Sequence, residues 1–154
     1  MPAALRPEAL SRRWLVRWVL VLCMALAASA GAAGELPDAQ AKAVRAVVQA
    51  QLDAFANDDA ERAFSYAAPS LHELFGDAST FMAMVQGQYG MLVKPESVLF
   101  LIPESVHDDV IQEVLLRDSA GRLWRAAYRL ELTAENGWRI NGCAVRPDDG
   151  RSSA

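Results

Sequence analysis

The periodicity of the apolar residues changes at Pro95, and this change limits the fold more than any other feature of the sequence. Before Pro95, apolar side chains recur every three or four residues, as in amphipathic helices. After Pro95 they recur with period two, as in the strands of an antiparallel sheet. Helices followed by strands predict an α+β domain, in which N-terminal helices pack on a curved, four-stranded antiparallel sheet.

The helical half contains the polar residues that first suggest a site. The longest helix is expected over residues 38–56. Asp58 or Asp59 is then placed to cap a second, short helix, because aspartate is a preferred residue at the start of a helix. Pro69 ends that short helix because it removes a backbone donor. Asp77 opens a further helix before the strands begin.

The strands are expected over residues 97–102, 109–118, 122–132 and 137–145. Three-residue loops, 119–121 and 135–137, put Gly121 and Gly137 where the backbone needs a positive φ. The resulting register pairs Leu116 with Trp124, Gln112 with Tyr128, Leu132 with Ile140, and Tyr128 with Ala144. The face covered by the helices then carries Val110, Gln112, Val114, Leu116, Trp124, Tyr128, Leu130, Leu132, Trp138 and Ile140. The opposite face is expected to be largely solvated.

Residues 1–30 differ in character from the rest of the chain. Four arginines give a basic start, and residues 18–30 follow without a charge. Thirteen such residues are typical of a signal peptide and too few to span a bilayer as a helix. Ala28, Ser29 and Ala30 have the small-x-small pattern that signal peptidase cleaves. We therefore expect a signal peptide, with an uncleaved N-terminal anchor as the alternative.

This prediction sets the domain organisation and the compartment. Residues 1–30 are the signal peptide, 31–37 a linker, 38–147 a single α+β domain and 148–154 a disordered tail. Residues 11–17 resemble the twin-arginine export motif, but the long apolar run favours general secretion. The protein is therefore expected to be periplasmic or secreted, with no stable membrane anchor after cleavage. Cys143 is then the one remaining cysteine, which excludes an intramolecular disulfide and is typical of a buried thiol.

The charge of the exported chain limits its partners. Without residues 1–30 the chain keeps 11 basic and 18 acidic residues, a net charge of −7. An acidic domain is poorly suited to nucleic acid or to anionic lipid, so neither is expected as a partner.

Three segments carry a resemblance to a known family. They are QLDAFANDDAERAFSYAAPSLHELFG (residues 51–76), FMAMVQGQY (residues 81–89) and WRINGCAV (residues 138–145). Together they resemble the bacterial family filed as domain of unknown function 4864, over roughly residues 41–145. The resemblance implies export and a nuclear transport factor 2-like cone, in which a curved sheet wraps around helices. It implies no activity, because relatives with this fold include isomerases, dehydratases and non-catalytic binding or dimerisation modules.

A cofactor-free isomerase or dehydratase on such a fold needs a base inside the cone and a polar partner for the developing oxyanion. The candidates are Asp58, Asp59 or His72 as the base, and Tyr66 or Tyr128 as the donor. Each has an ordinary structural explanation as well. Aspartate caps a helix, a histidine in a one-turn helix lies at the surface, and a tyrosine on an apolar face packs into the core.

Gln112 and Tyr128 form a second group of candidates, since the predicted register turns both under the helices. A buried amide needs hydrogen-bond partners, which Tyr128 and the backbone can supply. Alternatively, the pair marks the polar floor of a ligand pocket, with Trp124 and Trp138 on the same face. No metal or cofactor is expected, because the metal-ligand spacings, the phosphate-binding loop and the nucleophile elbow are all missing from the sequence.

These observations favour an exported, non-catalytic domain that binds a small apolar molecule or a protein partner. The alternative is a cofactor-free lyase or isomerase with an Asp base and a Tyr donor in the cone. A third interpretation is a homodimer, in which Leu115, Leu123 and Val145 would be buried against a second copy.

Overall fold

The computed structural model describes residues 35–150. Its helices come first: α2 (Asp38–Ala56), α3 (Ala60–Ser65), α4 (Pro69–Phe75), α5 (Ala78–Gln88) and the short 3-10 helix η1 (Gly90–Leu92). The strands follow: β1 (Ser97–Phe100), β2 (Glu104–Val106), β3 (Asp109–Arg117), β4 (Leu123–Thr133) and β5 (Gly137–Pro147). The predicted α+β class is thereby confirmed. The expected signal peptide, residues 1–30, lies outside the described residues.

The strands form one antiparallel sheet of five strands, in the order β1-β3-β4-β5, with β2 pairing with β3. The predicted number of four is wrong because the edge strand is interrupted. β1 pairs with the C-terminal half of β3 and β2 with its N-terminal half. Pro103 lies between them and has no N–H to donate to the ladder, so the chain leaves the sheet there and returns at Glu104.

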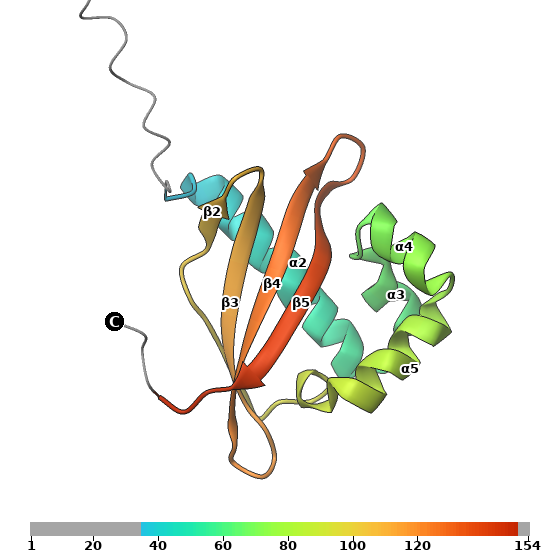
Figure 1. The fold of residues 1–154 in the computed structure, drawn as a ribbon, viewed down its shortest axis with the longest axis vertical. Helices are drawn as coiled ribbons and strands as arrows, with labels where there is room; N and C mark the ends of the chain where they lie inside the picture. The colour runs from blue at the N-terminus through green and yellow to red at the C-terminus, as the bar shows by residue number, and fades with distance from the viewer. Residues whose placement is uncertain (1–34, 151–154) are drawn as a thin grey trace, which may run out of the picture. The chain divides into compact units, whose positions relative to one another are not determined.

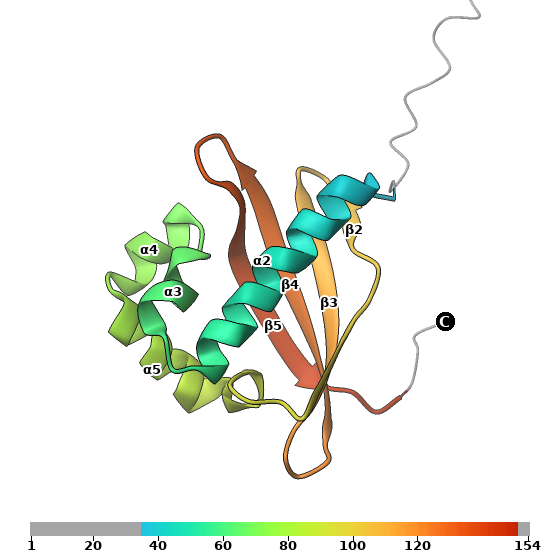
Figure 2. The same cartoon turned by 180° about the vertical axis from the view of Figure 1, so that it is seen from behind.

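The helices lie on one side of this sheet and beyond one of its edges. α2 crosses one face of β3, β4 and β5 diagonally, while α3, α4 and α5 stand beyond β5 (Figures 1 and 2). The core forms between α2 and the sheet, where Phe55, Val48, Val114 and Leu130 are fully buried. The other face of the sheet has no described helix over it.

The predicted register is confirmed between β3 and β4 but not between β4 and β5. Leu116 pairs with Trp124 and Gln112 with Tyr128, as expected. Gly121 and Gly137 both have positive φ, 76° and 70°. In the second hairpin, however, the loop is 134–136, so Leu132 pairs with Trp138 instead of Ile140. The end of this hairpin extends past the helices (Figure 1), which leaves Leu132 exposed instead of buried.

A β-bulge then changes which face of β5 meets the helices. Leu130 pairs with Ile140 and Arg129 with Gly142, so Asn141 is one extra residue in β5. Because side chains alternate along a strand, an extra residue reverses the two faces beyond it. Tyr128 therefore pairs with Cys143 and not with Ala144, and Val145 packs against the core instead of facing outward.

Candidate functional site

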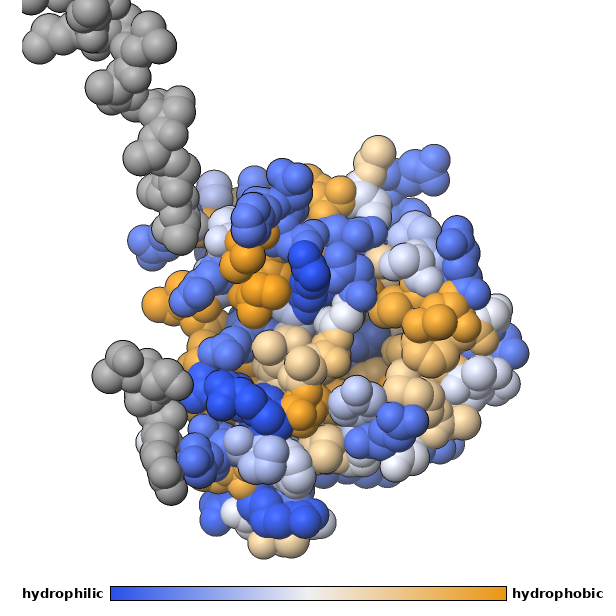
Figure 3. Space-filling view, in the orientation of Figure 1, coloured by the Kyte–Doolittle hydropathy of each residue, from blue (hydrophilic) through white to orange (hydrophobic). Residues whose placement is uncertain are grey.

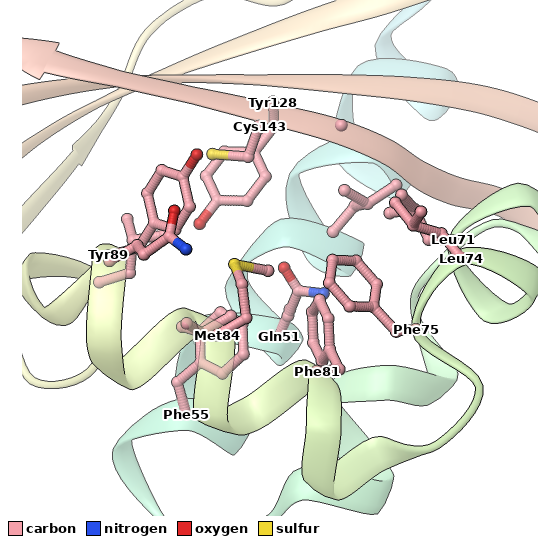
Figure 4. A pocket seen from close by; sticks show the side chains of 15 residues that line it. Gln51, Phe55, Leu71, Leu74, Phe75, Phe81, Met84, Tyr89, Tyr128 and Cys143 are labelled. Carbon is pink, nitrogen blue, oxygen red and sulfur yellow. The ribbon is translucent and has the colours of Figure 1, made fainter.

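A cavity of about 360 Å³ lies between the sheet and the helices α4 and α5. Ligand pockets span about 300–1,000 Å³, so this cavity is large enough for a small organic molecule. Its lining residues are Gln51, Phe55, Leu71, Leu74, Phe75, Phe81, Met84, Val85, Gln88, Tyr89, Leu92, Tyr128, Ile140, Gly142 and Cys143 (Figure 4). None of them carries a carboxylate, an imidazole or a cationic group. The cavity is therefore mostly apolar and uncharged.

α4 forms the outer wall of the cavity, and the edge of β5 holds it there. The backbone N–H of Ala68 donates to the carbonyl of Ile140 (2.8 Å), and the N–H of Ile140 donates to the carbonyl of Tyr66 (2.9 Å). Pro69 follows as the first residue of α4, where its fixed φ suits a helix start and its missing N–H costs nothing. The prediction that Pro69 ends the preceding helix is therefore wrong, because α3 has already ended at Ser65.

A cluster of phenylalanines joins the helices that surround the cavity. The ring of Phe81 in α5 lies 6.0 Å from Phe55, 5.2 Å from Phe64 and 5.4 Å from Phe75, measured between ring centroids. These distances fall in the range of favourable aromatic pairs. Phe81 thus connects α5 with α2, α3 and α4 at one point and fixes the width of the cavity.

Tyr128 brings the main polar group to the cavity wall. Its side chain is 1% exposed, and its hydroxyl has no nitrogen or oxygen partner among the described residues. The thiol of Cys143, a weak hydrogen-bonding group, lies beside it. In Figure 4 the hydroxyl points away from the sheet, into the space between Tyr89 and Met84. Burial raises the pKa of this hydroxyl well above its usual range, so the group stays neutral. A buried hydroxyl without a partner is costly and uncommon in a folded protein.

Cys143 and Gln51 add two further polar groups. The bulge turns Cys143 inward, opposite Tyr128, and burial raises the pKa of its thiol to about 12. Gln51 in α2 is 3% exposed, and its Nε2 donates to the carbonyl of Ala63 (3.1 Å). Its side-chain oxygen faces Met84 and Tyr128 across the cavity (Figure 4). The cavity thus offers hydroxyl and thiol hydrogens on the sheet side and the amide oxygen of Gln51 on the helix side, where Gln88 and Tyr89 at the end of α5 add an amide and a second hydroxyl.

The four residues predicted as catalytic candidates on the helices lie outside this cavity. Asp59 is exposed and caps α3, accepting from the backbone N–H of Arg62 (3.1 Å). Asp58 is exposed, with Oδ1 accepting from Nε2 of Gln86 (2.9 Å). Tyr66 is half-buried at the end of α3, and His72 is exposed and stacks on Phe64. None of the four lines the cavity, so none of them brings a base to Tyr128.

Of the four residues predicted to line a pocket, Tyr128 alone lines this cavity. Gln112 is fully buried, and its Nε2 donates to the carbonyls of Leu101 (2.7 Å) and Glu113 (2.9 Å). It faces a separate hollow beside the interruption of the edge strand. Trp124 donates from Nε1 to Asp118 (2.9 Å). Trp138 is half-buried, opposite the exposed Leu132.

The bond from Trp124 to Asp118 leads to a prediction about acid stability. The Trp124 donor, together with the backbone and side chain of Arg122, lowers the pKa of Asp118 from 3.8 to about 2. A carboxyl whose pKa is lower in the folded state stabilises the fold above its unfolded pKa, and this contribution is lost as the pH falls through the folded pKa. Asp118→Asn, which keeps one acceptor oxygen, should therefore lower the urea midpoint at neutral pH. The difference from wild type should vanish near pH 2. A difference that stays constant with pH would assign the effect to geometry instead of charge.

Several lining residues escaped prediction from the sequence. Gln51 was not considered because a polar residue in an amphipathic helix is expected at the surface. Cys143 is buried, as predicted, but the predicted pairing of Tyr128 with Ala144 does not place Cys143 opposite Tyr128, because it lacks the bulge. Met84 and Tyr89 also line the cavity, although apolar residues at helical spacing ordinarily predict core packing. The local feature of the sequence that indicates the α5 side of the cavity is the cluster of aromatic and sulfur-containing residues in 81–89.

Within residues 35–150, no helix is long and apolar enough to cross a bilayer. The same residues contain no group of three or more His, Cys, Asp or Glu side chains arranged to hold a metal ion.

Comparison with known proteins identifies a family but gives no activity. No curated protein matches the sequence. The family described as "Domain of unknown function (DUF4864)" matches residues 37–153, which include every described helix and strand. The chain therefore belongs to the DUF4864 family.

Proposed function

We propose that this protein is a non-catalytic binding module that holds a small, largely apolar molecule in the cavity beneath α4. The observation that carries the proposal is the buried hydroxyl of Tyr128 in the wall of a mostly apolar cavity. This hydroxyl has no nitrogen or oxygen partner among the described residues, and the thiol beside it, that of Cys143, is a weak one. Burying an unpaired polar group costs free energy, and a bound molecule that accepts this hydrogen bond removes that cost.

The arrangement of titratable groups supports binding over catalysis. A lyase or isomerase needs a base within hydrogen-bond reach of the substrate. Asp58, Asp59 and His72 are exposed and outside the cavity, and the cavity lining contains no Asp, Glu or His. Tyr128 and Cys143 both have raised pKa values, which makes neither of them an effective base at neutral pH.

Two further features complete the proposal. The basic start and uncharged run of residues 1–30 support export, by general secretion, to the periplasm or beyond. The order of helices before an open antiparallel sheet is the one expected of the nuclear transport factor 2-like cone, and we propose that fold on this ground.

The proposal can be tested with the chain from residue 31 onward, because the described residues, 35–150, belong to one compact unit. We expect native mass spectrometry of this chain, purified after export, to show a bound small molecule. Met84→Trp, which fills the cavity, should abolish the bound mass. Met91→Trp is the matched control, because Met91 is also half-buried but does not line this cavity.

A weak ligand can be lost during purification, so a second measurement is needed. In the second measurement, 1-octanol is titrated into the chain while amide chemical shifts are recorded by NMR. We expect shifts at cavity-lining residues in wild type and in Met91→Trp, and none in Met84→Trp. The absence of both a bound mass and octanol-induced shifts would refute the proposed function.

A further inference from the structure

We infer that the ligand is a neutral amphiphile with a hydroxyl or primary amide group at one end of an apolar body, held with that polar end against the sheet. This inference rests on the proposed function, because it specifies the ligand of the same cavity. The polar groups of the wall, the lack of charge and the position of the apolar side chains each support a part of it.

The polar end of the ligand is defined by Tyr128 and Gln51. The Tyr128 hydroxyl can donate one hydrogen bond, and among the described residues it has no nitrogen or oxygen partner, only the weak thiol of Cys143 beside it. The Gln51 amide nitrogen is committed to Ala63, which leaves its oxygen as an acceptor on the cavity side. A group that accepts from Tyr128 and donates to Gln51 must both accept and donate. Hydroxyl and primary amide groups do this, whereas an ether, a ketone or an ester can only accept.

The electrostatics of the cavity exclude a charged head group. No cationic side chain lines the cavity to pair with a carboxylate or phosphate. An unpaired ion that leaves water for such a site meets a large desolvation penalty. The raised pKa values of Tyr128 and Cys143 report the same penalty for negative charge on the wall itself. A fatty acid is therefore a poor ligand in its ionised form and a better one when protonated.

The apolar end of the ligand points toward α4. Leu71, Leu74 and Phe75 line this side of the cavity, and Leu74 is 71% exposed. Figure 3 shows apolar side chains gathered over the region of α4 and α5, beside a hollow in the surface. An exposed leucine at the rim gives an aliphatic or aromatic tail an apolar surface to cover. The opening thus favours a molecule whose tail leaves the cavity beneath α4.

The ligand must displace a side chain to reach the Tyr128 hydroxyl, because that atom is shielded from solvent. Met84 and Tyr89 flank it in Figure 4, and both are half-buried. Methionine has three rotatable bonds and adapts readily to irregular shapes. Met84 is therefore the side chain we expect to move when the polar end of a ligand enters.

The test compares 1-octanol with octanoate, which have the same chain length and differ in head group, by NMR titration of the chain from residue 31. We expect octanoate at neutral pH to bind at least roughly tenfold more weakly than octanol, because its charge is unpaired in the cavity. Octanoate binding should strengthen as the pH falls below the pKa of the acid. Equal affinities at neutral pH would overturn the inference but leave the proposed function intact.

Variants separate the role of Tyr128 from that of the cavity as a whole. Tyr128→Phe should weaken octanol binding roughly 3- to 10-fold, the effect of losing one hydrogen bond, and should also weaken any octanoate binding, because a carboxylate accepts from the same hydroxyl. Tyr66→Phe is the matched control, since Tyr66 does not line the cavity, and it should change neither. Unchanged octanol binding by Tyr128→Phe would overturn the assigned anchor. If neither probe binds the wild-type chain and native mass spectra show no ligand, both this inference and the proposed function fail.

Discussion

Replacing Gln112 by glutamate is expected to unfold most of the protein at neutral pH. Gln112 is fully buried, and its Nε2 donates to the carbonyls of Leu101 and Glu113. An ionised glutamate removes both donors and places a negative charge beside two carbonyl oxygens. The effective cost of burying an unpaired ion is several kcal/mol. The whole stability of a domain is only about 5–15 kcal/mol, so one substitution can consume most of it.

The buried carboxyl of this variant should affect stability with pH in the opposite sense to the Asp118 carboxyl of the wild type, whose pKa is lowered. Desolvation raises the folded-state pKa of a buried carboxyl above its unfolded value. Below the unfolded pKa both states are protonated and the charge costs nothing. As the pH rises from the unfolded to the folded pKa, stability is lost. Gln112→Glu should therefore gain stability on acidification, measured as the urea midpoint followed by circular dichroism.

Gln112→Leu is the control without a charge. It removes the Gln112 donor from both carbonyls, at about 1 kcal/mol for each lost hydrogen bond. The Glu113 carbonyl still accepts from the backbone N–H of Leu101 (3.0 Å). The substitution also removes Oε1 of Gln112, a buried acceptor without a partner among the described residues, which offsets part of that loss. We expect a smaller destabilisation that does not vary with pH. If Gln112→Glu behaves like Gln112→Leu at every pH, the side chain must reach solvent and the assignment of Gln112 as a buried link is wrong.

Gln112 also illustrates where prediction from the sequence succeeded and where it failed. Its backbone pairing with Tyr128 was predicted correctly, because the loop that ends at Gly121 fixes the register locally. The pocket predicted to be shared by Gln112 and Tyr128 was not found, because Gln112 faces the hollow beside the edge strand and Tyr128 lines the cavity beneath α4. The interruption of the edge strand beside Pro103 leaves the Leu101 carbonyl for the Gln112 amide, and that interruption depends on how two short strands share β3.

The face of β5 was mispredicted for a similar reason. Alternation along a strand is a reliable guide only while the register is continuous. Asn141 is the extra residue that interrupts the register. The contacts around this bulge are made with residues that are distant in the sequence. Nδ2 of Asn141 donates to Glu131 in β4 (3.0 Å), while Ile140 bonds to Tyr66 and Ala68 before α4. No local pattern in residues 137–145 signals these contacts, so the pairing of Cys143 with Tyr128 could not be predicted from the sequence, although burial of the thiol could.

Phe81→Ala is expected to be the most destabilising truncation in the helical half. Phe81 is buried in α5, and its ring contacts those of Phe55, Phe64 and Phe75. Truncating a buried phenylalanine to alanine costs about 3–5 kcal/mol, which combines lost burial with the cavity left behind. Here the new space joins an existing cavity, so the helices have little to collapse onto. Urea unfolding with a linear extrapolation measures this loss directly.

Leu74→Ala supplies the comparison, because Leu74 lines the same cavity but is largely exposed. Substitutions at such positions usually change stability by less than about 0.5 kcal/mol. Leu74→Ala should therefore leave the urea midpoint near that of wild type while weakening octanol binding at the rim. If Phe81→Ala costs less than about 1 kcal/mol, α5 would not depend on the aromatic cluster. The width of the cavity would then be set by the attachment of α4 to β5, through Tyr66, Ala68 and Ile140.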